Sequence, residues 1–595
     1  MNKYPSIPLA QTVVRLCAQN KIERVVICAG SRNAPLTNGF VSDSSFKTYS
    51  IVDERAAAFF ALGMAQQLKQ PVALVCTSGS ALLNFYPAIA EAFYSDIPLV
   101  VLSADRMPHR IDIGDGQTIR QTGVFDLHIE TSAILKPDVS HATETLLQNP
   151  MQQLLSFSAT PQEIKEIQRN NQHHNEQEIL RVLNVALNQK GPVHLNIPLE
   201  EPLYEMTSEA IPLAEYKLEA SAFFDDHKLI QRMKQQWHKT PKKWVIIGVL
   251  SPGAIEQKQI DLLCEDPSVI VFTETTSNIK HSKTIYSIDT LMASLEISEA
   301  ELSKTLQPEL VLTFGGMVVS KKIKFFLRNN PPQYHWHVDE KKAYNTYYRL
   351  DQHLKATPTL FLDKLYKDVS ITAETSYQKS ILSLFETFKS KGRTYLDSIS
   401  FSDLNVFDHI SKTLPEGIQL QISNSSSIRY AQLMEWPTKT TFFCNRGTSG
   451  IDGSTATAIG AALIAKTPTV LITGDLSFFY DINGLWNDYI PSNFKILLIN
   501  NNGGGIFRII KGEKDSPKYD RYFETIHNRN AKHLAKVFGF SYQKAETKLQ
   551  LKRKLVRFYK AYSTSQLLEI KTPRKLNDIV LLNYFKAMAI NTIIL

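Results

Sequence analysis

Short runs of Val, Ile and Leu recur along the whole chain, and each is followed by small or polar residues and then by a helix-like segment. Such runs are typical of strands that are buried on both faces of a parallel sheet. The alternation of strand and helix predicts an α/β fold with three successive doubly wound parallel-sheet domains. The predicted strands are Arg24–Ala29, Pro71–Cys76, Pro98–Ser103, Val193–Ile197, Trp244–Val249, Ser268–Thr273, Glu309–Phe314, Tyr334–Val338, Ile418–Ile422, Thr440–Cys444, Thr469–Thr473, Lys495–Asn500 and Gln566–Ile570.

Polar and acidic stretches interrupt this pattern and indicate where domains end. Residues 160–178 are polar and predict an exposed helix or loop, while residues 200–219 and 368–374 are typical of connectors. We therefore expect a first domain at 1–198, a central Rossmann-like domain at 199–370 and a last domain at 371–595. The first and last domains share the order strand, glycine-containing loop, helix, which suggests a duplicated architecture.

Composition narrows the class of protein. With 43% apolar and 21% charged residues, the 595-residue chain has the make-up of a globular protein. Its net charge of +8 is spread among acidic residues without a basic block, which favours small anionic ligands and argues against a nucleic-acid partner. The five cysteines lie far apart, and no apolar run reaches the ~18 residues that span a bilayer. We expect a cytoplasmic protein that does not enter membranes.

A group of polar residues in the last domain has the chemistry of a metal-bound diphosphate site. Gly474-Asp475-Leu476 ends one predicted strand, and Asn501 and Gly503 follow the end of the next strand along the chain. Since the carboxyl ends of parallel strands share one sheet edge, these residues should meet there. The Asp475 carboxylate, the Asn501 amide oxygen and the Gly503 carbonyl would be hard oxygen ligands for Mg²⁺ or Mn²⁺. The alternative is an ordinary turn followed by an ordinary loop.

A second carboxylate stands at the start of an unusually apolar helix. Glu54 follows an expected apolar strand and precedes the run 56–65, in which almost every residue is apolar. A carboxylate in this position should be partly desolvated, and burying a charge without purpose is costly. The alternative is a first-turn glutamate that interacts favourably with the helix dipole.

Together these motifs resemble those of thiamine-diphosphate enzymes, in which Gly-Asp-Gly is followed at a similar distance by Asn-Asn. Asn501 lies 26 residues after Asp475, although Leu476 replaces the third-position glycine. The resemblance implies that Glu54 contacts N1′ of the aminopyrimidine ring of the cofactor. It also implies a pyrimidine-binding first domain and a diphosphate-binding last domain.

A closer resemblance extends over essentially the whole chain. The chain is similar to the 2-succinyl-5-enolpyruvyl-6-hydroxy-3-cyclohexene-1-carboxylate synthases of the menaquinone pathway, in which Leu after Gly-Asp is also found. The stretches that carry this likeness are 29–36 (AGSRNAPL), 77–81 (TSGSA), 103–106 (SADR), 117–121 (QTIRQ), 445–453 (NRGTSGIDG) and 500–507 (NNNGGGIF).

The resemblance implies a transferase that decarboxylates 2-oxoglutarate and adds the succinyl carbanion to isochorismate. Both substrates are dianions, so guanidinium groups are expected around them. Residues implied for the substrate pocket are Ser31, Arg32, Arg106, Gln117, Lys321, Ser425, Arg429 and Arg446. Residues implied for the cofactor, besides Glu54, are Ile451, Gly474, Asp475, Leu476, Asn501, Gly503, Ile506 and Phe507.

Several of these assignments have alternatives. The arginines could form surface ion pairs, Gln117 and Ser425 could be turn or cap residues, and the apolar residues could belong to the core. Lys322 could replace Lys321 in the pocket. Gly116 and Ser423 stand where the family usually has Asn and Gly, which leaves their consequences open.

The family also implies a homodimer or a dimer of dimers with active sites at the subunit interface. Two rival functions stay open. One is another thiamine enzyme, such as an acetolactate-synthase-like carboligase or a simple 2-oxo acid decarboxylase. The other is a non-catalytic binding or scaffold protein that has kept the fold.

Overall fold

The computed structural model describes residues 4–149, 152–213, 227–297, 304–367, 375–509, 516–560 and 564–588. The chain divides into two compact units. The first unit comprises Met1–Ser221, Asp452–Lys466 and Asp481–Pro491, and the second comprises Ala222–Ile451, Thr467–Tyr480 and Ser492–Leu595. The predicted connector 368–374, with the predicted boundary after residue 370, lies outside the described residues, as does the end of the predicted connector 200–219.

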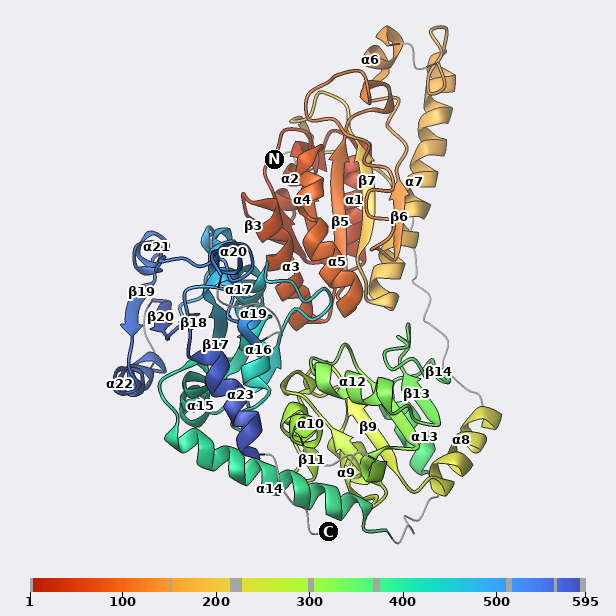
Figure 1. The fold of residues 1–595 in the computed structure, drawn as a ribbon. Coiled ribbons are helices and arrows are strands. Elements are labelled where there is room, and N and C mark those ends of the chain that lie inside the picture. Colours follow the sequence, from red (N-terminus) through yellow and green to blue (C-terminus); the bar gives the residue numbers. More distant parts are fainter. Residues whose placement is uncertain are drawn as a thin grey trace. The chain divides into compact units, whose positions relative to one another are not determined.

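The first unit contains a six-stranded parallel sheet with the order β3-β2-β4-β5-β7-β6 (Figure 1). Helices α1, α2 and α7 cover one face of this sheet, and α3 packs against α5. The strands are β2 (Arg24–Ile27), β3 (Lys47–Ser50), β4 (Val72–Cys76), β5 (Leu99–Asp105), β6 (Thr131–Ile134) and β7 (Val193–Pro198), and β1 (Tyr4–Pro5) pairs with β8 (Met206–Thr207). The helices are α1 (Pro8–Gln19), α2 (Ala34–Ser42), α3 (Glu54–Leu68), α4 (Ser80–Asn84), α5 (Tyr86–Ser95), η1 (Pro108–Arg110), α6 (Thr143–Gln148), α7 (Pro161–Gln189), α17 (Ser454–Ile464) and η3 (Ile482–Leu485).

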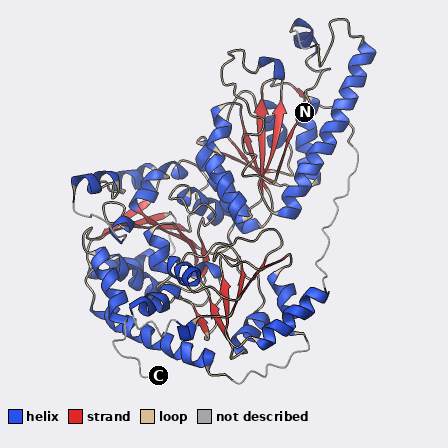
Figure 2. Ribbon diagram, turned by 45° about the vertical axis from the view of Figure 1, so that its right-hand side comes forward, coloured by secondary structure: helices blue, strands red, loops and turns tan. Residues whose placement is uncertain are grey.

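The second unit contains two six-stranded parallel sheets flanked by helices (Figure 2). The central sheet has the order β11-β10-β9-β12-β13-β14 and the last sheet the order β16-β15-β17-β18-β20-β19. The strands are β9 (Lys243–Ile247), β10 (Val269–Phe272), β11 (Thr284–Ile285), β12 (Leu310–Phe314), β13 (Tyr334–Val338), β14 (Gln352–Leu354), β15 (Gln419–Ile422), β16 (Thr441–Phe443), β17 (Thr469–Gly474), β18 (Phe494–Asn500), β19 (Ser541–Ala545) and β20 (Gln566–Lys571). The helices are α8 (His227–Lys239), α9 (Gln257–Glu265), η2 (Thr275–Ser277), α10 (Ile288–Ile297), α12 (Lys321–Asn329), α13 (Pro358–Tyr366), α14 (Tyr377–Ser398), α15 (Asp403–Thr413), α16 (Ser426–Ala431), α18 (Asp475–Tyr480), α19 (Ile506–Ile509), α20 (Pro517–Tyr522), α21 (Lys532–Val537), α22 (Lys548–Phe558) and α23 (Asn577–Met588).

The strand orders confirm the predicted α/β class and the shared plan of the first and last sheets. Both sheets run second, first, third, fourth, sixth, fifth when their strands are numbered along the chain. The central sheet instead runs third, second, first, fourth, fifth, sixth, which is the order of dinucleotide-binding folds. This strand order agrees with the Rossmann-like character predicted for the central domain.

All of the predicted strands form, with ends that shift by one or two residues. The pattern did not predict the short strands β1 and β8, and in the six-stranded sheets it did not predict β6, β11, β14 and β19, each of which lies at the edge of its sheet. The expected apolar strand before Glu54 is β3, also an edge strand, in which only Tyr49 is buried. Edge strands have one free side and tolerate polar residues, so a search for apolar runs misses them. The polar stretch 160–178 is helical and belongs to α7.

Helices α3 and α17 cross within the first unit at very short range. A Cβ atom on Gly63 would overlap the backbone oxygen of Thr457, and one on Gly460 would overlap the backbone oxygen of Phe60. Only glycine permits this approach of two helix backbones. The crossing explains why residues 452–466 belong to the first unit although they follow the last domain's first two strands. It also holds the helix that begins with Glu54.

Candidate active site

Glu54 is the first residue of α3 and stands at the carboxyl end of the first sheet. Asp53 caps the helix by accepting a hydrogen bond from the backbone N–H of Ala56 at 2.9 Å. The half-buried Glu54 carboxylate accepts a hydrogen bond from Asn84 Nδ2 at 3.3 Å. Burial raises the pKa of the nearby Cys28 thiol, and the negative charges of Glu54 and Asp53 raise it further. A carboxylate is thus held beside the buried end of β2.

The loop after β2 carries Ser31 and Arg32, which differ in their surroundings. Ser31 is exposed, whereas only 2% of the Arg32 surface is accessible. The Arg32 guanidinium donates to the Leu199 carbonyl at 3.0 Å and to Glu201 Oε1 at 3.2 Å, and its Nε has no hydrogen-bond partner among the described residues. Arg32 therefore forms an ion pair with the exposed Glu201, although its own side chain is buried.

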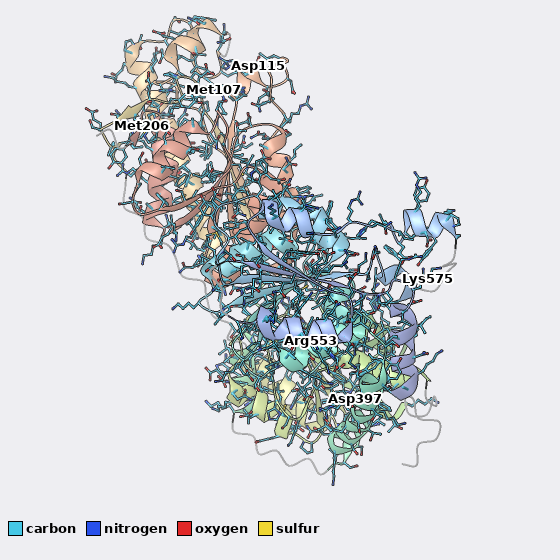
Figure 3. All side chains as sticks on the ribbon, turned by 90° about the vertical axis from the view of Figure 1, so that its left-hand side faces the viewer. Met107, Asp115, Met206, Asp397, Arg553 and Lys575 are labelled. Carbon is cyan, nitrogen blue, oxygen red and sulfur yellow. The ribbon has the colours of Figure 1, made fainter. Side chains whose placement is uncertain are left out.

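The loop after β5 places Arg106 beside Gln117. Arg106 donates to the Gly116 carbonyl at 3.2 Å, while its buried Nε has no partner in the described part of the chain. Gln117 is exposed and has a φ of 55°, which suits a turn residue. A Cβ on Gly116 would meet nothing within 4 Å, so the loop has room for the larger residue usual in the family. Figure 3 labels Met107 and Asp115 in this loop.

In the second unit, Asp475 and Gly503 meet at the carboxyl edge of β17 and β18. Asp475 is 3% exposed and starts α18 directly after β17. Its Oδ1 accepts from the Leu476 N–H at 2.7 Å, and its Oδ2 accepts from the Gly503 N–H at 3.0 Å. His527 Nε2 lies 3.3 Å from the same Oδ2. The two loops that the sequence predicted to meet are therefore joined by a direct hydrogen bond.

Asn501 presents an oxygen that needs a partner. Its Nδ2 donates to Asp403 Oδ2 at 2.8 Å, which fixes the amide and leaves Oδ1 buried without a hydrogen-bond partner among the described residues. Burial raises the pKa of Asp403 to about 6, against the hydrogen bonds that stabilise its charge. An unsatisfied buried acceptor costs about 1–3 kcal/mol, and a cation would remove that cost.

The donors present fit a magnesium or manganese ion. Among the described residues, no three His, Cys, Asp or Glu side chains gather into a metal-binding group. The candidate ligands are all hard oxygen atoms: the carboxylate of Asp475, the amide oxygen of Asn501 and the backbone carbonyl of Gly503. Three such ligands leave further coordination positions of the ion for phosphate oxygens and water. This set suits a diphosphate held through a divalent ion.

Asn424 organises the loops around Arg446. Its Nδ2 donates to the carbonyls of Asn445 and Gly450 at 2.6 and 2.7 Å, and its Oδ1 accepts from the Arg446 guanidinium at 2.8 Å. Ser423, the departure from the family pattern, accepts a hydrogen bond from the Gly474 N–H at 3.4 Å through its hydroxyl. Arg446 is thus oriented by a neighbour that the candidate residues did not include.

A cavity of about 260 Å³ brings the predicted lysines and Arg429 together. Its wall includes both Lys321 and Lys322, so both of the lysines that the sequence offered as alternatives line the cavity. Burial lowers the pKa of Arg429. The negative charge of Asp289 raises this pKa, and the positive charge of Arg446 lowers it further. The described residues that line the cavity are Asp289, Lys321, Lys322, Ser426, Arg429, Tyr430, Leu433, Ile506, Ile509, Leu581 and Phe585.

Three candidate residues, Ser425, Phe507 and Ile451, are not among the residues that line this cavity. Ser425 precedes α16 with a φ of 68°, and its hydroxyl does not cap the helix. The Phe507 ring lies 6.3 Å from the Phe523 ring, centre to centre, and belongs to an aromatic contact. Ile451 is 36% exposed, so the alternative of an ordinary core residue is wrong for it.

The structure adds polar residues that the sequence did not single out. They are Glu274, Asp403, Asn424 and His527. Asn424 lies between Ser423 and Ser425, which the sequence analysis had singled out, so its position was a usable signal. His527 reaches Asp475 from 52 residues further along the chain, and no local pattern marks it.

Three family models match the chain. They are the N-terminal TPP binding domain of thiamine pyrophosphate enzymes over residues 7–125, the "middle domain of thiamine pyrophosphate" over 206–422, and the C-terminal TPP binding domain over 424–570. Three relatives carry the name 2-succinyl-5-enolpyruvyl-6-hydroxy-3-cyclohexene-1-carboxylate synthase. The protein of Christiangramia forsetii is 49% identical over 98% of this chain and 100% of its own length. Those of Flavobacterium psychrophilum and Flavobacterium johnsoniae are 47% and 45% identical over 98% of this chain, and over 99% and 100% of their own lengths.

The chain belongs to this synthase family. The resemblance read from the motifs is confirmed, as are the thiamine-enzyme fold and the assignment as a thiamine-diphosphate-dependent enzyme. As in other thiamine pyrophosphate enzymes, the matched N-terminal and C-terminal regions are TPP binding domains. Among the described residues, no helix is both long and apolar enough to cross a membrane.

Proposed function

We propose that the chain decarboxylates 2-oxoglutarate and adds the resulting succinyl carbanion to isochorismate. The products are 2-succinyl-5-enolpyruvyl-6-hydroxy-3-cyclohexene-1-carboxylate and CO₂, for menaquinone biosynthesis. One carbon–carbon bond breaks as CO₂ leaves, one forms to the ring alkene, and one proton is taken up. The observation that carries the proposal is the 260 Å³ cavity, where Lys321, Lys322 and Arg429 face apolar side chains. Three cations against the single carboxylate of Asp289 suit a dianion with a carbon skeleton.

Thiamine diphosphate and a divalent ion are the proposed cofactors. Asp475, Asn501 and the Gly503 carbonyl would hold Mg²⁺ or Mn²⁺, which in turn would hold the diphosphate. The other residues that would lie along the cofactor are Gly474, Leu476, Ile451, Ile506 and Phe507. When bound, thiamine diphosphate supplies the carbanion chemistry, because its thiazolium ring takes up the electron pair that is left when CO₂ leaves.

The proposed roles of the remaining residues follow from their charges. Glu54 would hold a proton at N1′ of the aminopyrimidine. Because both substrates carry two carboxylates, the guanidinium groups would neutralise and orient them. The proposed substrate-binding residues are Ser31, Arg32, Arg106, Gln117, Lys321, Ser425, Arg429 and Arg446.

Three further proposals rest on the resemblance and on composition. The chain forms a homodimer or a dimer of dimers with active sites at the subunit interface. It works in the cytoplasm on small molecules, without nucleic-acid or membrane partners. Its domains extend over residues 1–198, 199–370 and 371–595, a division that the three separate sheets support.

The test is a spectrophotometric assay of the full chain with isochorismate, 2-oxoglutarate, thiamine diphosphate and Mg²⁺. We expect consumption of isochorismate that depends on all three other components. Pyruvate, which has one carboxylate, should replace 2-oxoglutarate poorly. Equal or better use of pyruvate would identify a generic carboligase instead.

A further inference from the structure

Gln121 lies at the centre of a buried polar network in the first unit. Its side chain is completely buried. Its Nε2 donates to Asn196 Oδ1 at 2.7 Å and to the Ala104 carbonyl at 3.3 Å. Its Oε1 accepts a hydrogen bond from the Gly79 N–H at 2.9 Å. One side chain therefore joins the neighbouring strands β5 and β7 to the loop that follows β4.

One arm of this network leads from Gln121 to the backbone of Arg106. Asn196 Nδ2 donates to Asp105 Oδ2 at 2.7 Å, and Asp105 Oδ1 accepts from the Arg106 N–H at 2.8 Å. Burial raises the pKa of Asp105, and these two hydrogen bonds lower it. Since an amide group has its donor and its acceptor on opposite sides, the hydrogen bond from Gln121 helps to decide which side of Asn196 faces Asp105. The strand end before Arg106 is thus fixed through two amide side chains.

Ser103 and His194 complete the hydrogen bonds around the Asn196 amide. Ser103 Oγ donates to Asn196 Oδ1 at 3.0 Å and lies 2.7 Å from His194 Nε2. Burial lowers the pKa of His194 to about 3, so its ring is neutral at pH 7. Because the proton of the hydroxyl is used on Asn196, the neutral ring donates from Nε2 to Ser103. Replacing one amide of this cluster would therefore leave buried polar groups unpaired.

A second arm of the network leads to Gln117. Gly79, which donates to Gln121, has a φ of 86°, and a Cβ atom there would lie 3.0 Å from the Gln117 backbone oxygen. The loop after β4 is therefore in close contact with the Gln117 backbone. Arg106 in turn donates to the Gly116 carbonyl at 3.2 Å. Both arms thus end on the same loop.

We propose that Gln121 is a positioning residue, which holds the Arg106 guanidinium and the Gln117 loop in the arrangement that meets a substrate carboxylate. The inference rests on the proposed function, in which Arg106 and Gln117 bind substrate. Arg106 Nε is buried without a hydrogen-bond partner among the described residues, so a carboxylate would satisfy it. A guanidinium that is moved out of line loses the directional hydrogen bonds that make such contacts strong. Because Gln121 is completely buried, it acts through its neighbours and does not touch the substrate.

The test compares Gln121→Met with Gln11→Met in the full chain with thiamine diphosphate and Mg²⁺. Gln11 is a buried glutamine of the same unit: its Nε2 donates to the Pro5 carbonyl at 2.9 Å, and its Oε1 accepts from the Ile211 N–H at 3.1 Å. Both variants lose the hydrogen bonds of an amide, so both should be less stable in denaturant. Only Gln121→Met should raise KM about tenfold or more for one of the two proposed substrates, and kcat should change less, because only this variant displaces Arg106.

A double-mutant cycle separates positioning from a general loss of order. If Gln121 acts through Arg106, Gln121→Met should raise KM much less when Arg106 is already alanine, so the two effects should not add. In the same cycle, the effects of Gln11→Met and Arg106→Ala should add. Gln121→Glu keeps the acceptor for Gly79 but lacks the amide N–H groups. It should show the same increase in KM, and it decides the matter if Gln121→Met does not fold.

The outcomes distinguish this inference from the proposed function. A natural chain that consumes no isochorismate overturns the proposed function and the positioning role with it. If the natural chain is active, equal KM values in Gln121→Met and Gln11→Met, or additive effects of Gln121→Met and Arg106→Ala, overturn the positioning role alone. If neither variant of Gln121 folds, the residue serves folding and the inference is overturned.

Discussion

Removal of the Asn501 side chain should remove most of the cofactor's effect on stability while changing the stability of the cofactor-free protein little. In Asn501→Ala the hydrogen bond from Nδ2 to the Asp403 carboxylate is lost, which costs about 1.5–3 kcal/mol. The same change removes the buried, unpaired Oδ1 and recovers about 1–3 kcal/mol. The two effects oppose each other, so without cofactor the free energy of unfolding should change by only about 1 kcal/mol.

With Mg²⁺ and thiamine diphosphate the two proteins should differ strongly. At a cofactor concentration about 100 times its Kd, the natural chain gains about 2.7 kcal/mol from binding. If loss of a metal ligand weakens binding about 100-fold, the gain at the same concentration falls to about 0.4 kcal/mol. Denaturant unfolding with and without cofactor measures both gains. Asn502→Gly, which removes a neighbouring amide at a φ of 67°, is the control and should keep the full gain. Equal cofactor stabilisation in Asn501→Ala and the natural chain would place the metal elsewhere.

Three further predictions concern Glu54, Arg429 and Asp481. Glu54→Gln should still bind the cofactor but lose most activity; NMR of proton exchange at C2 of the bound cofactor should show slowed exchange, and an unchanged rate would refute the assignment. Arg429→Ala should lower kcat/KM by a factor that corresponds to about 2–5 kcal/mol, because one wall of the cavity loses its cation. The loss should be larger for one substrate than for the other. Equal losses for 2-oxoglutarate, isochorismate and pyruvate would contradict a substrate-specific role. Burial raises the pKa of Asp481 to about 7, above its usual 3.8, so the folded state holds a proton that the unfolded state releases between these values. The natural chain should therefore lose stability by about 1.4 kcal/mol per pH unit as pH rises from 4 to 7, relative to Asp481→Asn, and parallel stability profiles would count against this.

The central strands of the sheets could be predicted from the sequence, whereas most of the edge strands could not. Strands such as β4 and β5 are buried on both faces, so they are apolar throughout and leave a clear signal. The edge strand β19 is largely half-exposed, and its sequence resembles that of a loop. The assignment of α17 to the first unit could not be predicted either, because it depends on the approach of Gly63 to Thr457 and of Gly460 to Phe60, residues that lie far apart in the chain.

For the candidate site, short sequence motifs identified which residues lie at the ends of strands. They did not identify the residues that hydrogen-bond to these side chains and fix their positions. Asp475 and Gly503 were predicted to meet because adjacent parallel strands end at one edge. That Asn501 is oriented by Asp403 depends on an acid 98 residues earlier in the chain. Contacts of this kind follow from tertiary packing, and a pattern of spacing within one loop carries no information about them.

Helix α12 shows where this limit matters most for function. The sequence gives four basic residues on one short helix, and their spacing alone places Lys324 and Arg328 on a common face. It does not reveal that this face borders a second pocket, of about 270 Å³, because that depends on where β13 brings His335 and where the following loop brings Tyr347. A basic helix that composition alone would assign to the solvent therefore separates two cavities, one with the predicted substrate residues and one without.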